Sequence, residues 1–529
     1  MGQQDDHDGS RLASSVAATL ISLACGTNYV YSAWAPQFAE RLGLSSTQSN
    51  LIGSFGNLGV YSLGVPVGIF LDRNGPRPFV LLGSVLLATG YFPLHQAYDS
   101  GSGSVPVLCF FSFVTGLGSC MAFAAAVKTS ALNWPNHRGT ATAFPVAAFG
   151  LSAFLFSFLG SVLFPGDPSA FLKLLSWGTF SCTFVGFFFL RTSPHAAYRS
   201  LPRSDDAASP DAASPDPRNG TPPDAAKPFR WRPAEAGMLP SEAVDSASGA
   251  QASLDSGSGP PVDQNDADER SSLTRPEVVA TSNVDADLGR RLDVRGLRLL
   301  QTQSFWLLFS IMALLAGVGL MTINNIGNDV NALWKQYDSS VSTSFLIHKQ
   351  QMHVSILSVC SFVGRFISGV GSDLLVKRLH ASRIWCLAIA CVVFLAAQSS
   401  ALAVQNPRLL GFVSGFSGLG YGLLFGVFPS LVTEAFGIRG LSQNWGFMTL
   451  APVMSSSLFN LFYGQVYDRH SIIDSQGRRY CMDGVTCYRA AYWVSFGACS
   501  IGLVVALEAI RLERLASVRL VADRVQRQA

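Results

Sequence analysis

A single arginine stands inside a long apolar stretch in the second half of the chain, in the run Val363-Gly-Arg365-Phe366. It lies well inside that stretch, between His348 on one side and Lys377 on the other. An isolated charge in apolar surroundings is costly, so such a residue usually faces a cavity or a partner. Because a guanidinium is a planar fork, it can bind a carboxylate through two hydrogen bonds. Arg365 is therefore a candidate for a substrate-binding or gating role.

A structural role for Arg365 is the alternative. The side chain could extend to a polar interface along its apolar stem, or it could pair with Asp373, two helical turns further on. Both alternatives remain open at the level of the sequence.

Uncharged polar residues interrupt other apolar stretches, and hydrogen bonding between helices explains most of them without any ligand. They include Asn28, Tyr29, Tyr31, Tyr61, Asn324 and Asn325.

A second pattern with chemical meaning joins Gly68 to an Asp-Arg pair, Asp72 and Arg73, and then to Gly75 and Arg77. Gly68 permits the close approach of two helices, and Asp72 can meet the N-terminus of another helix. Arg73 and Arg77 can pair with carboxylates or with lipid phosphates. The alternative is a chance turn of mixed charge that only fixes orientation.

The same pattern returns in the second half of the chain, where Gly369 and Asp373 are followed by the cations Lys377 and Arg378. The second glycine and the arginine directly after the aspartate are missing. Matching loops in two halves indicate an internal repeat of a whole bundle of helices.

The elements that carry these residues are predicted to be membrane-spanning helices. Of the 529 residues 13% are charged and 49% hydrophobic, whereas soluble domains carry about 25% charged residues. Long uncharged runs, such as 42–71 and 299–328, exceed the roughly 20 residues that cross a bilayer as a helix. A barrel would instead show short alternating segments. We therefore expect an all-α integral membrane protein that contacts the lipid bilayer through many spans.

Twelve spans are predicted, six on each side of a break. They lie near 12–36, 47–71, 78–97, 106–131, 140–163, 171–190, 303–327, 351–374, 383–404, 408–433, 442–465 and 489–510. This organisation predicts an N-terminal six-helix bundle in 1–192, a linker in 193–300, a C-terminal six-helix bundle in 301–512 and a tail in 513–529.

The linker is rich in Pro, Asp, Ala and Ser and cannot bury enough apolar area to fold, so we expect it to be disordered. Its Ser-Pro pairs near Ser209 and Ser214 are either phosphorylation sites or the chance content of a proline-rich segment. Cationic loops after the second, eighth and tenth spans place the linker and both termini in the cytoplasm. Arg469 and Arg479, in the loop after the eleventh span, argue against this orientation but weigh less than early loops.

The ten cysteines mostly occur singly in apolar runs, where they read as packing residues. Cys481 and Cys487 differ, because both lie in the polar loop before the last span. They are close enough to form a disulfide if that loop faces an oxidising compartment.

The pattern from Gly68 to Arg77 resembles the loop 2-3 signature of the major facilitator superfamily at every diagnostic position. Within that superfamily the chain is similar to the nodulin-like group and its fungal relatives, which stand near the monocarboxylate porters. The similarity rests on Phe305-Trp306, Gly317-Val-Gly319-Leu320, Ile323-Asn324-Asn325-Ile-Gly327, Asn133-Trp134-Pro135 with Arg138-Gly139, and Gly150-Leu151-Ser152.

The resemblance implies a twelve-helix fold in two bundles, with the first and seventh spans facing a central cavity. It therefore favours Asn28, Tyr31, Asn324 and Asn325 as substrate-binding residues, and the loop residues as conformational ones. In monocarboxylate porters an arginine at the place of Arg365 pairs with the substrate carboxylate. Those porters also carry an aspartate one turn earlier, where this chain has Ser361.

The sequence thus predicts a secondary transporter of a small solute, with an organic anion such as a monocarboxylate as first candidate and a proton as candidate coupling ion. The alternative is a membrane sensor or adaptor of the same fold that binds a solute without moving it. An enzyme is disfavoured, because the spans hold no paired acids, Ser-His set or metal-ligand cluster. The formal charge of +3 gives no reason to expect a nucleic-acid partner, and no cofactor is expected. The oligomeric state, the membrane and the substrate are not encoded in any pattern that we find.

Overall fold

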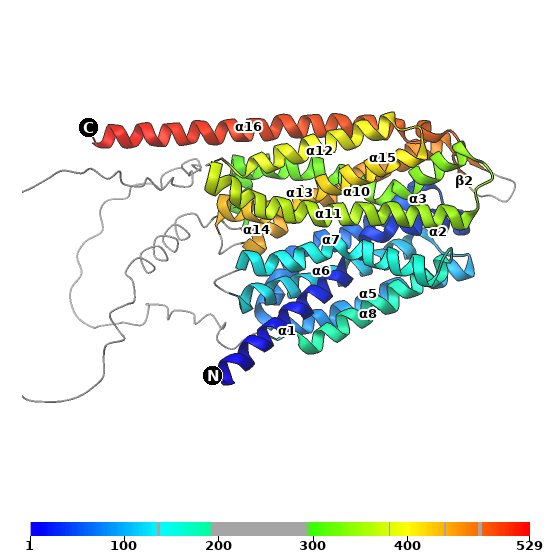
Figure 1. The fold of residues 1–529 in the computed structure, drawn as a ribbon, viewed down its shortest axis with the longest axis horizontal. Helices are drawn as coiled ribbons and strands as arrows, with labels where there is room; N and C mark the ends of the chain where they lie inside the picture. The colour runs from blue at the N-terminus through cyan, green and yellow to red at the C-terminus, as the bar shows by residue number, and fades with distance from the viewer. Residues whose placement is uncertain are drawn as a thin grey trace, which may run out of the picture.

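The chain folds into long helices that run side by side (Figure 1). The computed structural model describes residues 2–134, 138–191, 294, 296–379, 381–437, 441–473 and 479–528. Within these residues the regular structure is helical apart from one antiparallel hairpin, in which β1 (Ile472–Ile473) pairs with β2 (Arg479–Tyr480).

The first half of the chain supplies one bundle. Its elements are α1 (Gly2–Cys25), η1 (Gly26–Ala33), α2 (Ala35–Leu42), α3 (Ser46–Ser62), α4 (Gly64–Asn74), α5 (Arg77–Ser100), α6 (Val105–Asn133), α7 (Arg138–Leu163) and α8 (Pro168–Phe189). Local sequence fixes several starts: Ser45 and Gln48 form a capping box at α3, and the Asp167 side chain caps α8 ahead of Pro168.

The second half supplies the other bundle. Its elements are η4 (Gly296–Gln301), α10 (Gln303–Tyr337), α11 (Thr343–Leu379), α12 (Ile384–Ala403), η5 (Pro407–Leu409), α13 (Leu410–Phe436), α14 (Leu441–Met448), α15 (Leu450–His470), η6 (Gly484–Cys487) and α16 (Arg489–Gln528).

Each of the twelve predicted spans corresponds to a helical rod in the described residues, and ten of these are long and apolar enough to cross a membrane. The other two are broken rods, and the span predicted at 47–71, although among the ten, is also broken, into α3 and α4 on either side of Leu63. The span predicted at 12–36 becomes α1 and η1, which meet at Gly26, and the span at 442–465 becomes α14 and α15, which meet at Thr449. A side chain at Gly26 would lie 2.1 Å from the carbonyl oxygen of Phe149, so this junction packs directly on α7 because Gly26 has no side chain.

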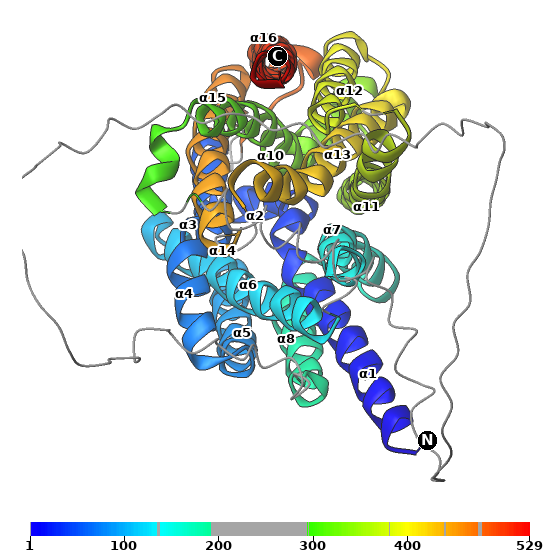
Figure 2. The ribbon, with the colours of Figure 1, turned by 90° about the vertical axis from the view of Figure 1, so that its left-hand side faces the viewer.

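Both termini lie at one end of the molecule and the β hairpin at the other (Figure 1). We call these the terminal end and the disulfide end. Seen along the helices, the bundles meet where α7 packs against α11 and where α3 packs against α15 (Figure 2). The outward faces expose large apolar side chains, including Phe110, Phe158, Phe366, Leu458 and Val504. Apolar side chains on this surface can contact hydrocarbon, and each helix satisfies its own backbone hydrogen-bonding groups, as a structure in lipid requires.

Two predicted boundaries need comment. The tail predicted at 513–529 does not begin as a separate segment, since α16 is one helix of 40 residues that ends at Gln528. The linker predicted at 193–300, with Ser209 and Ser214, lies outside the described residues apart from Val294 and η4. The Val294 backbone N–H donates to the carbonyl of Phe436, 3.1 Å away, and so fixes the start of the second half against α13.

Candidate functional site

Arg365 lies within α11 at the junction of the two bundles, and it is 5% exposed. Its Nη1 donates to the backbone carbonyl of Val146 in α7, 2.7 Å away. The guanidinium carbon lies 5.8 Å from the ring centre of Phe149 and 5.7 Å from that of Phe425. The two remaining donor atoms, Nε and Nη2, have no hydrogen-bond partner. The site therefore presents a buried cation with free N–H groups.

Arg365 is buried, and among the described residues it makes no ion pair with a carboxylate. A side chain at Gly150 in α7 would lie 3.0 Å from Arg365 Nε, so a glycine lets α7 approach closely. Asp373 is ion-paired with Arg383 instead, at 2.6 Å. The pairing of Arg365 with Asp373 considered above is therefore absent from this structure.

Three tyrosines join the bundles beside this arginine. The hydroxyl oxygens of Tyr29 and Tyr61 are 2.8 Å apart, those of Tyr61 and Tyr421 3.0 Å, and those of Tyr29 and Tyr421 3.2 Å. The rings of Tyr61 and Phe425 stack with centres 6.3 Å apart, so the tyrosine cluster adjoins the ring against which Arg365 rests. Each hydroxyl carries one donor and two acceptor sites, so the cluster can exchange a mutual hydrogen bond for one to a ligand.

The predicted binding residues Asn28 and Tyr31 lie elsewhere. Both line a small polar pocket inside the N-terminal bundle, together with residues of α3, α5 and α6. The Tyr31 hydroxyl lies 2.6 Å from the carbonyl oxygen of Ser49, to which it donates. Asn28 Nδ2 has no partner, and its Oδ1 accepts from Thr115 at 3.5 Å. Arg365 does not line this pocket.

Asn324 and Asn325 differ from each other in their hydrogen-bond partners. Asn325 Oδ1 accepts from Asn50 of α3 at 2.8 Å, and its Nδ2 donates to Asn460 of α15 at 3.1 Å. Asn325 therefore ties the two bundles together. Asn324 is 3% exposed, and its Nδ2 has no partner.

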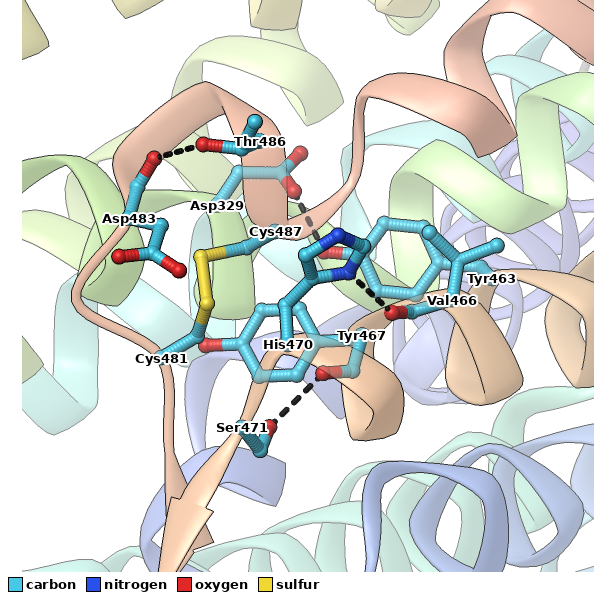
Figure 3. The surroundings of a disulfide bond; sticks show 10 residues. All are labelled: Asp329, Tyr463, Val466, Tyr467, His470, Ser471, Cys481, Asp483, Thr486 and Cys487. Carbon is cyan, nitrogen blue, oxygen red and sulfur yellow. Dashed lines mark hydrogen bonds between the residues drawn. A yellow bond between two sulfur atoms is a disulfide. The ribbon is translucent and has the colours of Figure 1, made fainter.

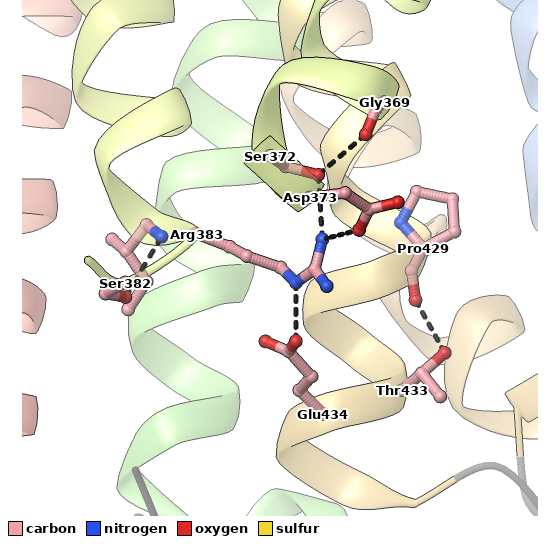
Figure 4. Close-up of polar contacts among 9 residues, drawn as sticks. Gly369, Ser372, Asp373, Ser382, Arg383, Pro429, Thr433 and Glu434 are labelled. Atoms are coloured by element: carbon pink, nitrogen blue, oxygen red, sulfur yellow. Dashed lines mark hydrogen bonds and ion pairs between the residues drawn. The ribbon is translucent and has the colours of Figure 1, made fainter. Parts of the chain in front are cut away.

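Of the conformational residues predicted in the second half, Gly369 and Asp373, only Asp373 belongs to an ionic cluster at the terminal end (Figure 4). Arg383 binds Asp373 through Nη1 at 2.6 Å and Glu434 through Nε at 2.5 Å. Burial acts to lower the pKa of Arg383, but the attraction of Glu434 and the bonds to both carboxylates raise it overall. Gly369 plays no packing part here, since a side chain added to it would meet nothing within 4 Å. The cluster joins α11, the start of α12 and α13 within one bundle.

In the first half, the corresponding loop is bound to its own bundle. Gly75 ends α4 with a positive φ of 79°, a conformation that favours glycine. Arg77 Nε donates to the carbonyl of Leu190 at 3.1 Å, and its guanidinium lies 5.5 Å from the ring centre of Phe187. Arg73 is exposed.

Two further residues of this loop complete the predicted set. Gly68 lies within α4 and is half-buried. The side chain of Asp72 lies outside the described part of the structure.

A third copy of the glycine–aspartate pattern was missed in the sequence. Asp468, in the last turn of α15, accepts hydrogen bonds from the backbone N–H groups of Ser46 and Thr47, at 2.7 and 2.9 Å. The Thr47 hydroxyl donates a third, at 2.5 Å. Asp468 thus caps α3 of the other bundle at the disulfide end, where a carboxylate complements the free N–H groups.

The signal for this cap is present in the sequence. The run Gly464-Gln-Val-Tyr-Asp468-Arg469 repeats the spacing of Gly68-Ile-Phe-Leu-Asp72-Arg73. A side chain at Gly464 would lie 2.7 Å from the Cα of Thr47, so this glycine permits the close contact of α15 with α3.

The disulfide end also carries a covalent link. Cys481 and Cys487 form a disulfide whose Cα atoms are 6.1 Å apart, and both side chains are buried. It closes the loop between the β hairpin and α16.

The predicted site residues thus fall into four places: Arg365 at the centre, Asn28 and Tyr31 in one bundle, Asn325 in the bundle interface, and the charged residues at the terminal end. Tyr29, Tyr61 and Tyr421 lie near this centre; in the sequence, hydrogen bonding between helices explains Tyr29 and Tyr61, and no pattern singles out Tyr421. Among the described residues no group of His, Cys, Asp and Glu could hold a metal ion. The central site therefore combines a buried positive charge with two unpartnered N–H donor atoms.

Comparison with known proteins agrees with this architecture. The sequence profile described as Major Facilitator Superfamily matches residues 16–451. The uncharacterized membrane protein YMR155W of Saccharomyces cerevisiae is 29% identical over 92% of this chain and 91% of its own length. The probable transporter MCH1 of Gibberella zeae is 24% identical over 91% of this chain and 86% of its own.

Solved structures share the fold at low identity. A bacterial homologue of the human lysosomal transporter Spinster, in an inward-facing conformation, has a TM-score of 0.53 and 14% identity, with 98% of each chain covered. The xylose transporter XylE of E. coli has a TM-score of 0.54 and 12% identity, over 93% of this chain and 98% of its own. With its two six-helix bundles and a profile match that spans most of its length, the chain belongs to the Major Facilitator Superfamily, as a multi-pass membrane transporter.

Proposed function

We propose that the protein is a secondary transporter of a small organic anion, with a monocarboxylate as first candidate, and that Arg365 binds the anion's carboxylate. The observation that carries this proposal is the buried guanidinium with two unpartnered N–H donors at the junction of the bundles. A buried cation without a counter-charge is destabilising, and a bound carboxylate would remove that cost.

The geometry around Arg365 supports a ligand that accepts hydrogen bonds. Phe149 and Phe425 contribute cation–π attraction without occupying Nε or Nη2. One turn earlier in α11, Ser361 is buried and its hydroxyl has no partner. Since this position carries no carboxylate, we assign the anionic partner of Arg365 to the ligand.

Alternating access is the proposed mechanism, with the bundles of 1–192 and 301–512 rocking about the central site. We also propose that the terminal end faces the cytoplasm. The disulfide supports this orientation, because it lies at the opposite end of the molecule, where an oxidising compartment would preserve it. A single cysteine placed near Ser214 should react with a membrane-impermeant maleimide only from the cytoplasmic side, and reaction from the other side would reverse the orientation.

The test of the anion site uses purified protein in proteoliposomes with labelled acetate, lactate and pyruvate. Arg365→Lys keeps the charge but loses the two-pronged geometry, so affinity should fall on the order of tenfold. Arg365→Ala should abolish binding and flux. The control is Arg511→Ala, which removes an arginine whose side chain is 71% exposed.

Thermal stability is measured on the same samples. Unchanged affinity in an Arg365→Ala protein of lower melting temperature would show that the arginine is structural and would overturn the anion site. Binding of a carboxylate without any flux would instead identify a sensor or adaptor.

A further inference from the structure

A second ionisable group is buried in the C-terminal bundle, far along α10 from its start at the terminal end. Asp329 is 1% exposed. Its Oδ1 accepts a hydrogen bond from the hydroxyl of Tyr463 in α15, and its Oδ2 accepts one from the hydroxyl of Tyr492 in α16, both at 2.5 Å. Figure 3 shows the hydrogen bond between this carboxylate and Tyr463, near the Cys481–Cys487 disulfide.

The groups that face Asp329 are tyrosines. Tyr463 and Tyr467 come from α15, and their rings stack with centres 5.9 Å apart. Tyr488 directly precedes α16 and Tyr492 lies in its first turn, and the centres of their rings are 5.3 Å apart. In the part of the chain that the structure describes, no Lys, Arg or His makes an ion pair with Asp329.

Two charged residues, one near Asp329 on α10 and one at the end of α15, contact other groups. Lys335, further along α10, lies 4.9 Å from the ring centre of Tyr480. Asp468 caps α3.

Burial and hydrogen bonding act in opposite directions on the two protonation states of this carboxyl group. Burial favours the neutral acid, because an isolated charge loses its hydration. Two hydroxyl donors favour the ion, because hydrogen bonds to a charged acceptor are roughly twice as strong as neutral ones. A proton can bind to such a group and leave it without a large rearrangement, since each hydroxyl can turn from donor to acceptor.

A polar pocket lies close by at the disulfide end. It opens between the bundles and is lined by Asn328, Asn331, Lys335, Tyr467 and Cys481, among others. Tyr467 therefore touches the pocket on one side and stacks on Tyr463, the partner of Asp329, on the other. Tyr467 thus connects the pocket lining to the ring of Tyr463, whose hydroxyl binds Asp329.

We propose that Asp329 is a proton-binding site, reached from the pocket at the disulfide end past Tyr467. The reaction is the addition of one proton to the carboxylate, which gives the neutral acid; the acid then donates to one tyrosine hydroxyl and accepts from the other. A role of Asp329 in coupling proton movement to transport rests on the proposed function. A proton taken up together with a carboxylate would make the combined cargo neutral. Proton binding itself does not depend on the substrate.

The experiment measures the carboxyl group directly. Infrared difference spectra between acidic and alkaline buffer are recorded on purified protein in lipid, without substrate. Subtracting the Asp329→Asn spectrum from the native one should leave one carbonyl-stretch band of a neutral acid and the matching loss of carboxylate bands. Tyr463→Phe should keep that band but move its frequency, since one hydrogen-bond partner is gone.

The control is Asp338→Asn, directly after α10. The Ser340 hydroxyl, followed by the Ser340 backbone N–H, lowers the pKa of Asp338 by hydrogen bonding, so this exposed acid should stay ionised across the physiological range and its removal should leave the band intact. If subtraction of the Asp329→Asn spectrum leaves no acid band, and Tyr463→Phe shifts none, Asp329 does not change its protonation and the inference is overturned. This outcome would leave the anion site at Arg365 untouched.

Discussion

The two ends of the molecule hold their helices in different ways. At the disulfide end, described polar contacts cross from one bundle to the other: Asp468 caps α3, Asn325 binds Asn50, and Ser161 meets His348 at 3.1 Å. At the terminal end the described ionic contacts stay within one bundle, as in the cluster of Arg383 with Asp373 and Glu434. There the bundles meet through close packing, such as that of Gly446 on Val65, and through a hydrogen bond from the Thr449 hydroxyl to the backbone carbonyl of Tyr61 at 3.0 Å, with no charged group involved.

This difference bears on which end opens more easily. Directional bonds to a charged group have to be broken before α3 and α15 can separate, and each contributes about 1.5–3 kcal/mol. Packing contacts between a glycine and a valine can be exchanged for lipid or water with less loss. In the proposed alternating-access mechanism the structure therefore corresponds to a state whose disulfide end is closed and locked.

The largest effect on this lock should come from Asp468→Asn. The amide has one acceptor oxygen and places donors against the N–H groups of Ser46 and Thr47, so at most part of the cap survives. We expect the disulfide end to open more often, on the order of tenfold. The measurement is the rate at which a single cysteine at Asn331, which lines the pocket there, reacts with a maleimide.

Asp483→Asn serves as the matched control, because Asp483 is exposed in the neighbouring loop and its side chain has no described hydrogen bond. An unchanged reaction rate at Asn331 in the Asp468→Asn protein would show that the cap does not hold the bundles together.

A smaller effect is expected from Gly464→Ala. The new methyl group would lie 2.7 Å from the Cα of Thr47, and backbone atoms cannot give way as a side chain can. The helices must separate slightly, which should lengthen the Asp468 bonds and raise the labelling rate at Asn331 a few-fold. Gly497→Ala is the control, since nothing lies within 4 Å of its new methyl group. Equal labelling rates in the Gly464→Ala and Gly497→Ala proteins would show that Gly464 does not help to keep the disulfide end closed.

The sequence predicted those features that depend on one residue or on one short segment of the chain. Unbroken apolar runs predicted the positions of the helices, and the charge of Arg365 in such a run pointed to the central site. The pattern from Gly68 to Arg77 identified the superfamily. The apolar runs, the position of Arg365 and the Gly68–Arg77 pattern are all defined by residues close together in the chain, so hydrophobicity and residue type reveal them.

What the sequence could not supply is which side chains meet. Tyr29, Tyr61 and Tyr421 come from three helices in two bundles, and nothing in their local surroundings says that their hydroxyls converge. Asp329 looks like the polar edge of an apolar run, and only the folded chain shows that it is buried against Tyr463. Asn28 and Tyr31 were predicted to line the central cavity because the first span does so in the resembled superfamily, but a span has more than one face.

The smallest effect should come from the terminal end, with Arg383→Gln. The substitution removes two ion pairs, but the carboxylates of Asp373 and Glu434 are 59% and 46% exposed and can be hydrated instead. We expect the melting temperature to fall by about 2–4 °C, with no change in the labelling rate at Asn331. Since the pKa of Arg383 is raised, its contribution to stability is fully present below its unfolded value and is not lost as pH rises through the physiological range.

This last variant sharpens the comparison, because it separates stability from the balance between the two ends. The ionic cluster lies within one bundle, so its loss weakens that bundle whether the disulfide end is open or closed. Arg408→Gln, at the other end of α12, is the control for removing a cation from the same bundle; Arg408 is exposed and makes no described ion pair. If Arg383→Gln changed the labelling of Asn331 as strongly as Asp468→Asn does, the cluster would also couple the two bundles, and the contrast between the two ends would be wrong.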